Sequence, residues 1–385
     1  MKDISIYFSP INIGDNTYEA SQLGSRIVEV EDSTENLERG SVAFVFVDEY
    51  RNSDINPHQD DFSYILDKIY KLEGGSWQTD IYNLGKIKPG NSSADTFVAV
   101  KEVVSELVKN DIIPLVIGGS QDLTYAVYQG YAKLEQTINL MTVDAEFDLG
   151  DPEEEITHND WLNKIIMDKS SLLFNYTNLG YQSYYVKEEE LSLFNTMFFD
   201  THRLGDFYSN TKMVEPLVRN SDIVSFDLNA IRSSDYKGNS KDSPHGFYGE
   251  DACRIMRYAG LSDKLTSLGI FNFNSTDHFV KQDANLVAQM VWYFVEGVNH
   301  RNGDYPKCTK KKYTKYRVSI DDFKDEIVFY KSNKSARWWM EVPYPNSEKL
   351  KFQRHFMIPC TYEAYQAAQQ NEMPDLWWKT YQKLV

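Results

Sequence analysis

A mostly apolar run near the middle of the chain ends abruptly in acids. Residues 138–143 read Ile-Asn-Leu-Met-Thr-Val, and Asp144, Glu146 and Asp148 follow at alternate positions. Such runs are typical of strands buried on both faces of a parallel sheet. Alternate side chains of extended backbone point the same way, so we expect the three carboxylates to converge beyond the strand, where open α/β sheets place ligand sites. The alternative is turn chemistry, with one acid capping a helix and the others in solvent.

The same kind of strand alternates with helical patterns along the first 300 residues. Strand-like runs occupy residues 42–47, 81–84, 112–117, 138–143, 172–179, 197–199, 223–228 and 265–271. Helical spacing occupies residues 62–72, 91–110, 122–134, 250–259 and 282–299. We predict that Gly85 and Gly180 end two of the strands. This alternation predicts right-handed crossovers and a three-layer α/β fold, with helices on both faces of a mainly parallel sheet of about eight strands.

Length, composition and cysteine content indicate the size class of the protein and its compartment. The chain has 385 residues and is 42% hydrophobic, enough for one large domain with an appendage. No apolar run approaches the ~20 residues of a bilayer span, and the N-terminus lacks a signal-peptide pattern. Cys253, Cys308 and Cys360 are odd in number and far apart, which favours a reducing compartment. We therefore expect a cytoplasmic protein with no membrane partner.

Charge divides the chain unevenly. Residues 301–385 hold 16 Lys and Arg against 10 Asp and Glu, whereas the whole chain carries a net charge of −17. We interpret residues 1–300 as an acidic α/β domain and residues 301–385 as a basic, aromatic-rich α+β appendage packed on it, with strands near 327–331 and 337–342 and a helix near 361–370. The basic residues could hold a nucleic acid or an acidic partner, but contact with the chain's own acidic body is favoured. The pairs Trp338-Trp339 and Trp377-Trp378 are assigned to core or oligomer contacts in preference to base stacking.

Three strand ends share a pattern that resembles a known family. They read Gly118-Gly-Ser-Gln-Asp122, Asp144-Ala-Glu-Phe-Asp148 and Ser225-Phe-Asp-Leu-Asn229. In order and spacing they are similar to the metal motifs of the ureohydrolases (arginase, agmatinase and formimidoylglutamase), which run Gly-Gly-Asp-His-Ser, Asp-Ala-His-x-Asp and Ser-x-Asp-x-Asp. The resemblance covers roughly residues 40–300, including a Gly-rich turn at 246–250, and implies an arginase-like fold.

The resemblance also implies a ligand set, and this chain departs from it. The family holds two Mn²⁺ ions with two histidines and four aspartates. Three of these six positions keep their acid and three are changed: Asp144, Asp148 and Asp227 remain, while Gln121, Glu146 and Asn229 stand in place of His, His and Asp. Four carboxylates survive, and an all-oxygen set suits Mn²⁺, Mg²⁺ or Ca²⁺. The alternative is a relic site that binds no metal.

The family's catalytic and substrate positions can be compared in the same way. His158 lies in about the loop where arginases carry a proton-transfer histidine, so His158 and Asp148 are the candidate catalytic residues. A lone loop histidine can equally be a capping residue. Arginase-like members grip the guanidinium with a Glu in the stretch that here reads 269–274 and contains no acid. Asn272 and His245 are the candidate substrate-binding residues, and Asn272 cannot supply a charged bidentate contact.

Two functions of different classes follow from this comparison. The first is an arginase/formimidoylglutamase-like protein with a degenerate metal site, little or no hydrolase activity, and a binding or assembly role. The second is an active metal-dependent hydrolase of linear C–N bonds, of the amidine or formimino kind, on a non-guanidine substrate. We expect a homo-oligomer by analogy with the family. A small-molecule ligand and a protein partner for residues 301–385 are further candidates, and nucleic acid is not favoured.

Overall fold

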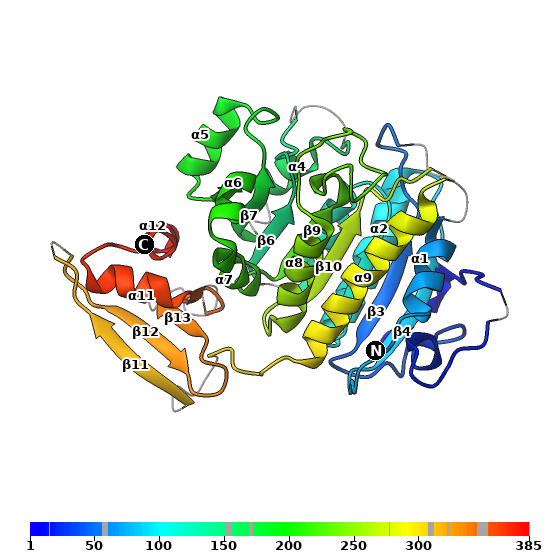
Figure 1. Cartoon of the computed structure of the whole chain (residues 1–385), viewed down its shortest axis with the longest axis horizontal. Coiled ribbons are helices and arrows are strands. Elements are labelled where there is room, and N and C mark those ends of the chain that lie inside the picture. The colour runs from blue at the N-terminus through cyan, green and yellow to red at the C-terminus, as the bar shows by residue number, and fades with distance from the viewer. Residues whose placement is uncertain are drawn as a thin grey trace.

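A large twisted sheet forms the centre of the protein (Figure 1). The computed structural model describes residues 1–14, 16–55, 61–134, 136–150, 156–168, 172–276, 278–306, 312–321, 323–344 and 353–384. Within these ranges the sheet has ten strands: β1 (Phe8–Ser9), β2 (Val28–Glu29), β3 (Val42–Val47), β4 (Ile81–Ile87), β5 (Ile113–Ile117), β6 (Ile138–Val143), β7 (Leu173–Tyr181), β8 (Asp200–Arg203), β9 (Ile223–Asp227) and β10 (Ser267–Phe271). Their order is β1-β4-β3-β5-β10-β9-β6-β7-β8, and β2 also pairs with β4.

Helices cover both faces of this sheet. They are α1 (Asp61–Tyr70), α2 (Ser93–Lys109), α3 (Leu123–Gln129), α4 (Trp161–Ile166), α5 (Glu188–Thr196), α6 (Leu204–Ser209), α7 (Val214–Arg219), α8 (Gly249–Leu261) and α9 (Val280–Asn299). Short 3₁₀ turns are η1 (Ser5–Tyr7), η2 (Leu23–Ser25), η3 (Ala132–Leu134), η4 (Thr211–Met213) and η5 (Leu228–Ala230). One core packs α1 and α6–α9 against the sheet, and a second packs α2–α5 against its other face. The predicted three-layer fold is confirmed, with every strand parallel to its neighbours except β1.

Residues after α9 form a second, antiparallel sheet (Figure 1). Its strands are β11 (Tyr313–Val318), β12 (Ile327–Ser332), β13 (Trp338–Glu341) and β14 (Met357–Cys360), and the helices α11 (Tyr362–Gln369) and α12 (Asp375–Leu384) follow. Trp338 and Trp377 belong to the apolar core of this unit. Three ion pairs join its basic residues to acids of the body: Arg354–Asp222, Arg337–Glu215 and Lys379–Asp200.

Several predicted boundaries differ from the structure. Gly85 does not end its strand, because its left-handed φ of 86° and a shift in register against β3 let β4 continue to Ile87. Gly180 likewise lies within β7, which also shifts register against β8. The strand predicted at 197–199 is instead the turn after α5, where Phe198 has a φ of 56°, and β8 begins at Asp200. Helices α4, α6 and α7 have six residues each, too few to show a period in the sequence, and the nine-residue α5 was not predicted either.

Two glycines allow α8 and α9 to pack closely. A Cβ on Gly297 would lie 2.5 Å from the carbonyl oxygen of Arg257 and 2.9 Å from the Cα of Gly260, and neither backbone atom can move alone. We expect Gly297→Ala to lower the free energy of unfolding by about 1–3 kcal/mol, despite its better helix propensity. Urea unfolding would measure the change. Gly205→Ala in α6 is the control, because nothing lies within 4 Å of its Cβ and we expect no loss.

No helix in the described ranges combines the length and apolar character needed to cross a bilayer.

Candidate functional site at the carboxyl edge of the sheet

Four neighbouring strands bring the predicted site residues to one edge. In the order β5-β10-β9-β6, all four are parallel, so their carboxyl ends lie side by side. Gln121 follows β5, Asn272 follows β10, Asp227 ends β9 and Asp144 follows β6. Strands β5 and β6 follow one another in the sequence, but in the sheet β10 and β9 lie between them. Such a change in strand order is where α/β folds typically bind ligands.

Hydrogen bonds link the ends of these strands. The backbone N–H of Gln121 donates to Oδ1 of Asn272 at 3.2 Å, and Nδ2 of Asn272 donates to Oδ1 of Asp227 at 2.8 Å. Asn272 adopts a left-handed φ of 63°, which asparagine tolerates better than most residues. Asn272 therefore connects β5 to β9 and has its amide engaged by the protein itself.

The acids after β6 converge by a different route from the one predicted. The backbone bends at Ala145 and Glu146, and Asp148 has a left-handed φ of 51°, so this stretch is not extended. The buried apolar side chains of Ala145 and Phe147 take the core side of the bend. Asp144 and Asp148 are 3% and 9% exposed, so the turn alternative with solvated acids does not describe them.

Each buried carboxylate accepts a hydrogen bond from the protein. Oδ1 of Asp144 accepts from the backbone N–H of Glu146 at 3.0 Å. Oδ2 of Asp148 accepts from the indole Nε1 of Trp161 at 2.9 Å. Oδ1 of Asp227 accepts from the backbone N–H of Asn229 at 2.8 Å, in addition to Asn272.

Burial and mutual repulsion disfavour the charged forms of these acids. Burial, followed by the charges of Asp148 and Asp227, raises the pKa of Asp144 well above its usual range. Burial and the charge of Glu146 do the same to Asp148. Burial raises the pKa of Asp227 to about 6, although its hydrogen bonds act in the opposite direction. Negative charge at this edge therefore requires a cation or a proton.

An ammonium group of the chain reaches the cluster. Nζ of Lys241 lies 2.7 Å from Oε2 of Glu146, and the Lys241 side chain is 30% exposed. Burial alone would lower the pKa of Lys241, but Glu146, Asp144 and Asp227 together raise it above its ordinary value. The same positive charge offsets part of the rise in the pKa of Asp148 and of Asp227. Lys241 thus acts electrostatically on all four carboxylates that the metal motifs supply.

The two amide positions of the ligand set differ in their contacts. Asn229 accepts from the backbone N–H and the hydroxyl of Ser240 at 2.9 and 3.1 Å, so its carbonyl oxygen is held by the loop that carries Lys241. Nε2 of Gln121 is buried and has no hydrogen-bond partner among the described residues. Within those residues, no three His, Cys, Asp or Glu side chains are grouped so that they could hold one metal ion. Gln121, Glu146 and Asn229 thus offer amide or carboxylate oxygens where the resembled manganese set has His, His and Asp.

The other predicted residues lie in two places. Nδ1 of His158 lies 3.2 Å from the carbonyl oxygen of Asn52, whose side chain contacts Asp122, so His158 is part of a loop contact next to the β5 end. His245 is exposed and lines a cavity of about 320 Å³ with Arg203 and Arg232. None of the six ligand positions lines that cavity.

Sequence reasoning missed Lys241 and Trp161. Lys241 stands in a polar loop with no periodicity, and its carboxylate partner is 95 positions away by number, so only the fold brings them together. Trp161 follows Asp148 by 13 positions. The apolar residues that follow Trp161 indicate that it is buried. Nothing in the spacing indicates that its indole donates to Asp148.

A family model described as the arginase family matches residues 62–296. The formimidoylglutamase of Staphylococcus aureus strain MSSA476 is 26% identical over 215 residues, which cover 52% of this chain and 67% of that protein. The protein of strain JH9 is 25% identical over the same length.

Solved structures show the shared fold. Formimidoylglutamase from Bacillus subtilis superimposes with a TM-score of 0.66 and 13% identity, covering 75% of this chain and 96% of that one. Formiminoglutamase from Trypanosoma cruzi, crystallised with Mn²⁺, gives a TM-score of 0.61 and 13% identity, covering 69% and 97%. The family match ends before the antiparallel sheet begins.

Proposed function

The chain belongs to the arginase family, and from this premise we propose that it is a formimidoylglutamase-like protein with little or no hydrolase activity and a binding role. In this proposal the carboxylate cluster binds an internal ammonium group in place of a metal pair. The fold is then retained as a scaffold, and ligand or partner binding replaces bond cleavage.

The ion pair between Lys241 and Glu146 carries the proposal. A metal pair in this cluster would neutralise several negative charges, and Lys241 already supplies one positive charge at 2.7 Å from Glu146. A cation added beside Lys241 would be repelled by it. Glu146 replaces a histidine of the family motif, so the substitution that removes an imidazole ligand also creates the partner of the lysine.

The remaining donors support the same interpretation. The side chains of Trp161 and Asn272 each donate to one oxygen of Asp148 and of Asp227, so these two oxygens already have hydrogen-bond partners in the protein. Asn229 is engaged by Ser240. Metal-bound water is the usual nucleophile of such hydrolases, because a divalent ion lowers the pKa of water. Without a fitted cation the edge has no comparable way to make hydroxide at neutral pH.

The residues at the family's substrate positions favour a non-guanidine ligand at this edge. Asn272 uses its amide to bridge the strand ends, and no acid stands in 269–274 to pair with a guanidinium. His158 contacts the Asn52 carbonyl through its imidazole, which makes a loop-positioning role preferable to proton transfer.

Metal content and turnover test this proposal. We expect protein purified without chelator to contain substoichiometric Mn, Mg and Ca. With added Mn²⁺ it should release no ammonia, formamide or urea above background from formiminoglutamate, arginine, agmatine or guanidinobutyrate. An active formimidoylglutamase assayed in parallel is the control. Mn²⁺-dependent turnover that disappears in Asp227→Ala would overturn the proposal in favour of an active hydrolase.

A further inference from the structure

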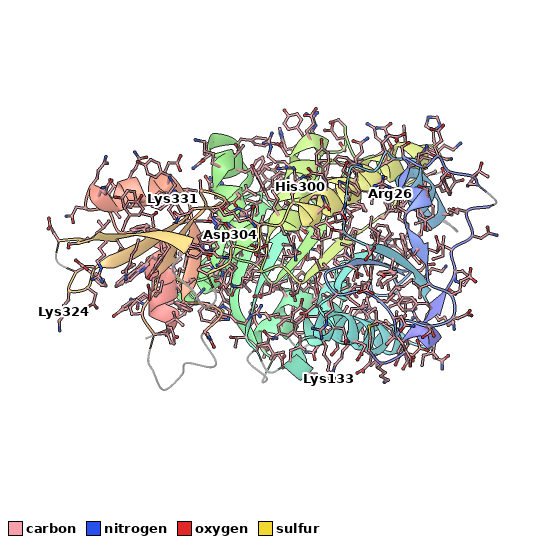
Figure 2. The ribbon with its side chains drawn as sticks, turned by 90° about the horizontal axis from the view of Figure 1, so that it is seen from below. Arg26, Lys133, His300, Asp304, Lys324 and Lys331 are labelled. Carbon is pink, nitrogen blue, oxygen red and sulfur yellow. The ribbon has the colours of Figure 1, made fainter. Side chains whose placement is uncertain are left out.

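A cavity of about 580 Å³ lies at the opposite edge of the large sheet, beside the amino ends of β5 and β10. Lys264 and Thr266 line it from the body, and Arg301, Tyr305 and Arg354 line it from the segment after α9. Figure 2 shows Asp304, the neighbour of Tyr305, at the junction between the body and the C-terminal strands. Cavities of roughly 300–1,000 Å³ are typical of small-molecule sites.

A buried ammonium group in this wall lacks a hydrogen-bond partner. The Lys264 side chain is 3% exposed, and its Nζ makes no hydrogen bond with any described residue. The nearest carboxylate oxygen, Oδ2 of Asp222, is 3.6 Å away and already accepts from the backbone N–H of Asn139 at 2.8 Å. Burial lowers the pKa of Lys264 to about 8. Asp222 is the ion-pair partner of this ammonium but makes no hydrogen bond at that distance, so an anion that accepted one would stabilise it further.

Two arginines add positive charge to the same wall. The Arg301 guanidinium donates to the carbonyl oxygens of Gly260 and Leu265 at 2.9 and 3.0 Å, and it pairs with no carboxylate of the described residues. Arg354 pairs with the other oxygen of Asp222, while its buried Nε has no hydrogen-bond partner in the described ranges. Asp222 is fully buried and pairs with both Lys264 and Arg354, so its one negative charge is shared between two cations.

Two acids also line the cavity, and the negative charge of Asp263 acts on Arg301. Asp263 accepts the backbone N–H groups of Gly303 and Asp304 at 3.0 and 2.9 Å. The exposed Asp111 lies 3.7 Å from Arg39. The remaining lining includes the apolar side chains of Val108, Ile112 and Leu265, which would contact an apolar portion of a ligand.

We propose that this cavity binds a small molecule bearing a carboxylate or phosphate group, whose oxyanion pairs with Lys264 and Arg354 once the buried Nζ of Lys264 and Nε of Arg354 turn toward it. Oxyanions are the natural partners of lysine and arginine, and charge-assisted hydrogen bonds are the strong ones. The site uses residues from both sides of the junction, so its ligand also links the appendage to the body. It does not depend on whether the carboxyl edge hydrolyses a substrate.

Thermal shift and calorimetric titration of the full chain test the site. Inorganic phosphate and succinate serve as the two probes, at pH 7 and at an ionic strength matched with NaCl. We expect at least one of them to raise Tm relative to NaCl, and the probe that does so identifies phosphate or carboxylate as the preferred group. In Lys264→Met, whose side chain fills the same space without charge, we expect Kd to rise at least tenfold.

Two further variants keep the result interpretable. Lys133→Met removes a lysine that pairs with Glu102 on the surface, where Figure 2 shows it, and it should bind like the parent. Arg354→Lys keeps the charge facing Asp222 but removes Nε, so it should weaken binding severalfold even if Lys264→Met does not fold. The proposal is wrong if neither probe exceeds NaCl, or if Arg354→Lys and a folded Lys264→Met both bind like the parent.

Discussion

Lys241→Met is expected to lower the free energy of unfolding by about 2–3 kcal/mol and to make stability depend on divalent cations. Removing one partner of a buried ion pair leaves the other charge uncompensated, which costs about 3–5 kcal/mol when both groups are fully buried. Lys241 is 30% exposed and Glu146 is 23% exposed, so solvent screening reduces the figure. Three further carboxylates share the same positive charge, which keeps the loss well above that of a surface pair.

The dependence of stability on divalent cations is the part of this prediction that tests whether Lys241 takes the place of a metal. With Lys241 removed, the acids Asp144, Glu146, Asp148 and Asp227 keep their oxygens and lose their only lysine partner among the described contacts. In the parent these acids, all within the described ranges, are not grouped to hold one ion. Without Lys241 the Glu146 carboxylate can turn toward the buried acids, and an oxygen-rich cluster suits Mn²⁺, Mg²⁺ and Ca²⁺. We expect these ions to raise the Tm of the variant by roughly 2–5 °C through ligand linkage, and to leave that of the parent nearly unchanged.

Urea unfolding in EDTA, followed by thermal scans with each cation, measures both effects. Lys86→Met is a matched control, because Lys86 is 31% exposed and pairs with Asp48 at 3.3 Å, but Asp48 is a single, half-exposed acid. We expect it to lose less than about 1 kcal/mol and to gain no cation dependence. If Mn²⁺ stabilises the parent as strongly as Lys241→Met, the ammonium does not take the place of a metal.

The sequence predicted the positions of the acids because topology leaves few choices. A buried run such as 138–143 must be a central strand, and its carboxyl end must face the ends of its parallel neighbours. The three motifs after β5, β6 and β9 therefore come together without knowledge of any loop. Their order in the sheet depends on where β10 inserts, and no local signal in 265–271 gives that.

Side-chain partners were harder to predict than positions. The sequence identified Asn272 as the candidate at the position where a family acid is missing. Its hydrogen bonds to Gln121 and Asp227 depend on a left-handed backbone conformation, which the sequence does not predict. Lys241 was missed because its loop has no period and its effect acts through space. Electrostatic partners are set by tertiary structure, whereas burial follows from local pattern.

In the C-terminal unit, too, burial was predicted better than the individual strands. Residues 313–318 read Tyr-Thr-Lys-Tyr-Arg-Val, and their alternation was hidden by the surrounding lysines, so β11 was not predicted. Strand β14 contains Pro359, which argues against a strand unless it lies at an edge, and β14 is the last strand of its sheet. Trp338, Trp339 and Trp377 are buried, in agreement with the predicted core role, whereas Trp378 is 40% exposed and is not a core residue.

Arg219→Met is expected to loosen the junction between the two units and to lower the free energy of unfolding by about 3 kcal/mol. Arg219 lies in α7 of the body and is 3% exposed. Its guanidinium donates to the carbonyl oxygen of Trp338 through both terminal nitrogens at 3.2 Å, and it lies 4.5 Å from the ring centre of Trp339. Nε lies 3.0 Å from Glu215. Methionine would leave the Trp338 carbonyl and Glu215 without this partner, and buried groups left in that state are costly.

Unfolding followed by tryptophan fluorescence and by far-UV circular dichroism distinguishes the outcomes. If Arg219 holds the appendage to the body, the variant should show the appendage tryptophans changing environment at a lower urea concentration than the helices of the body unfold. Arg317→Met is the control, because its ion pair with Glu326 lies within the appendage and both side chains are exposed, so we expect a change below about 0.5 kcal/mol. A single transition at the parent midpoint would mean that the apolar contacts around Trp338 and the other ion pairs hold the junction without Arg219. The appendage would then be a part of the body's folding unit, and the anion cavity at their junction would be as rigid as the sheet itself.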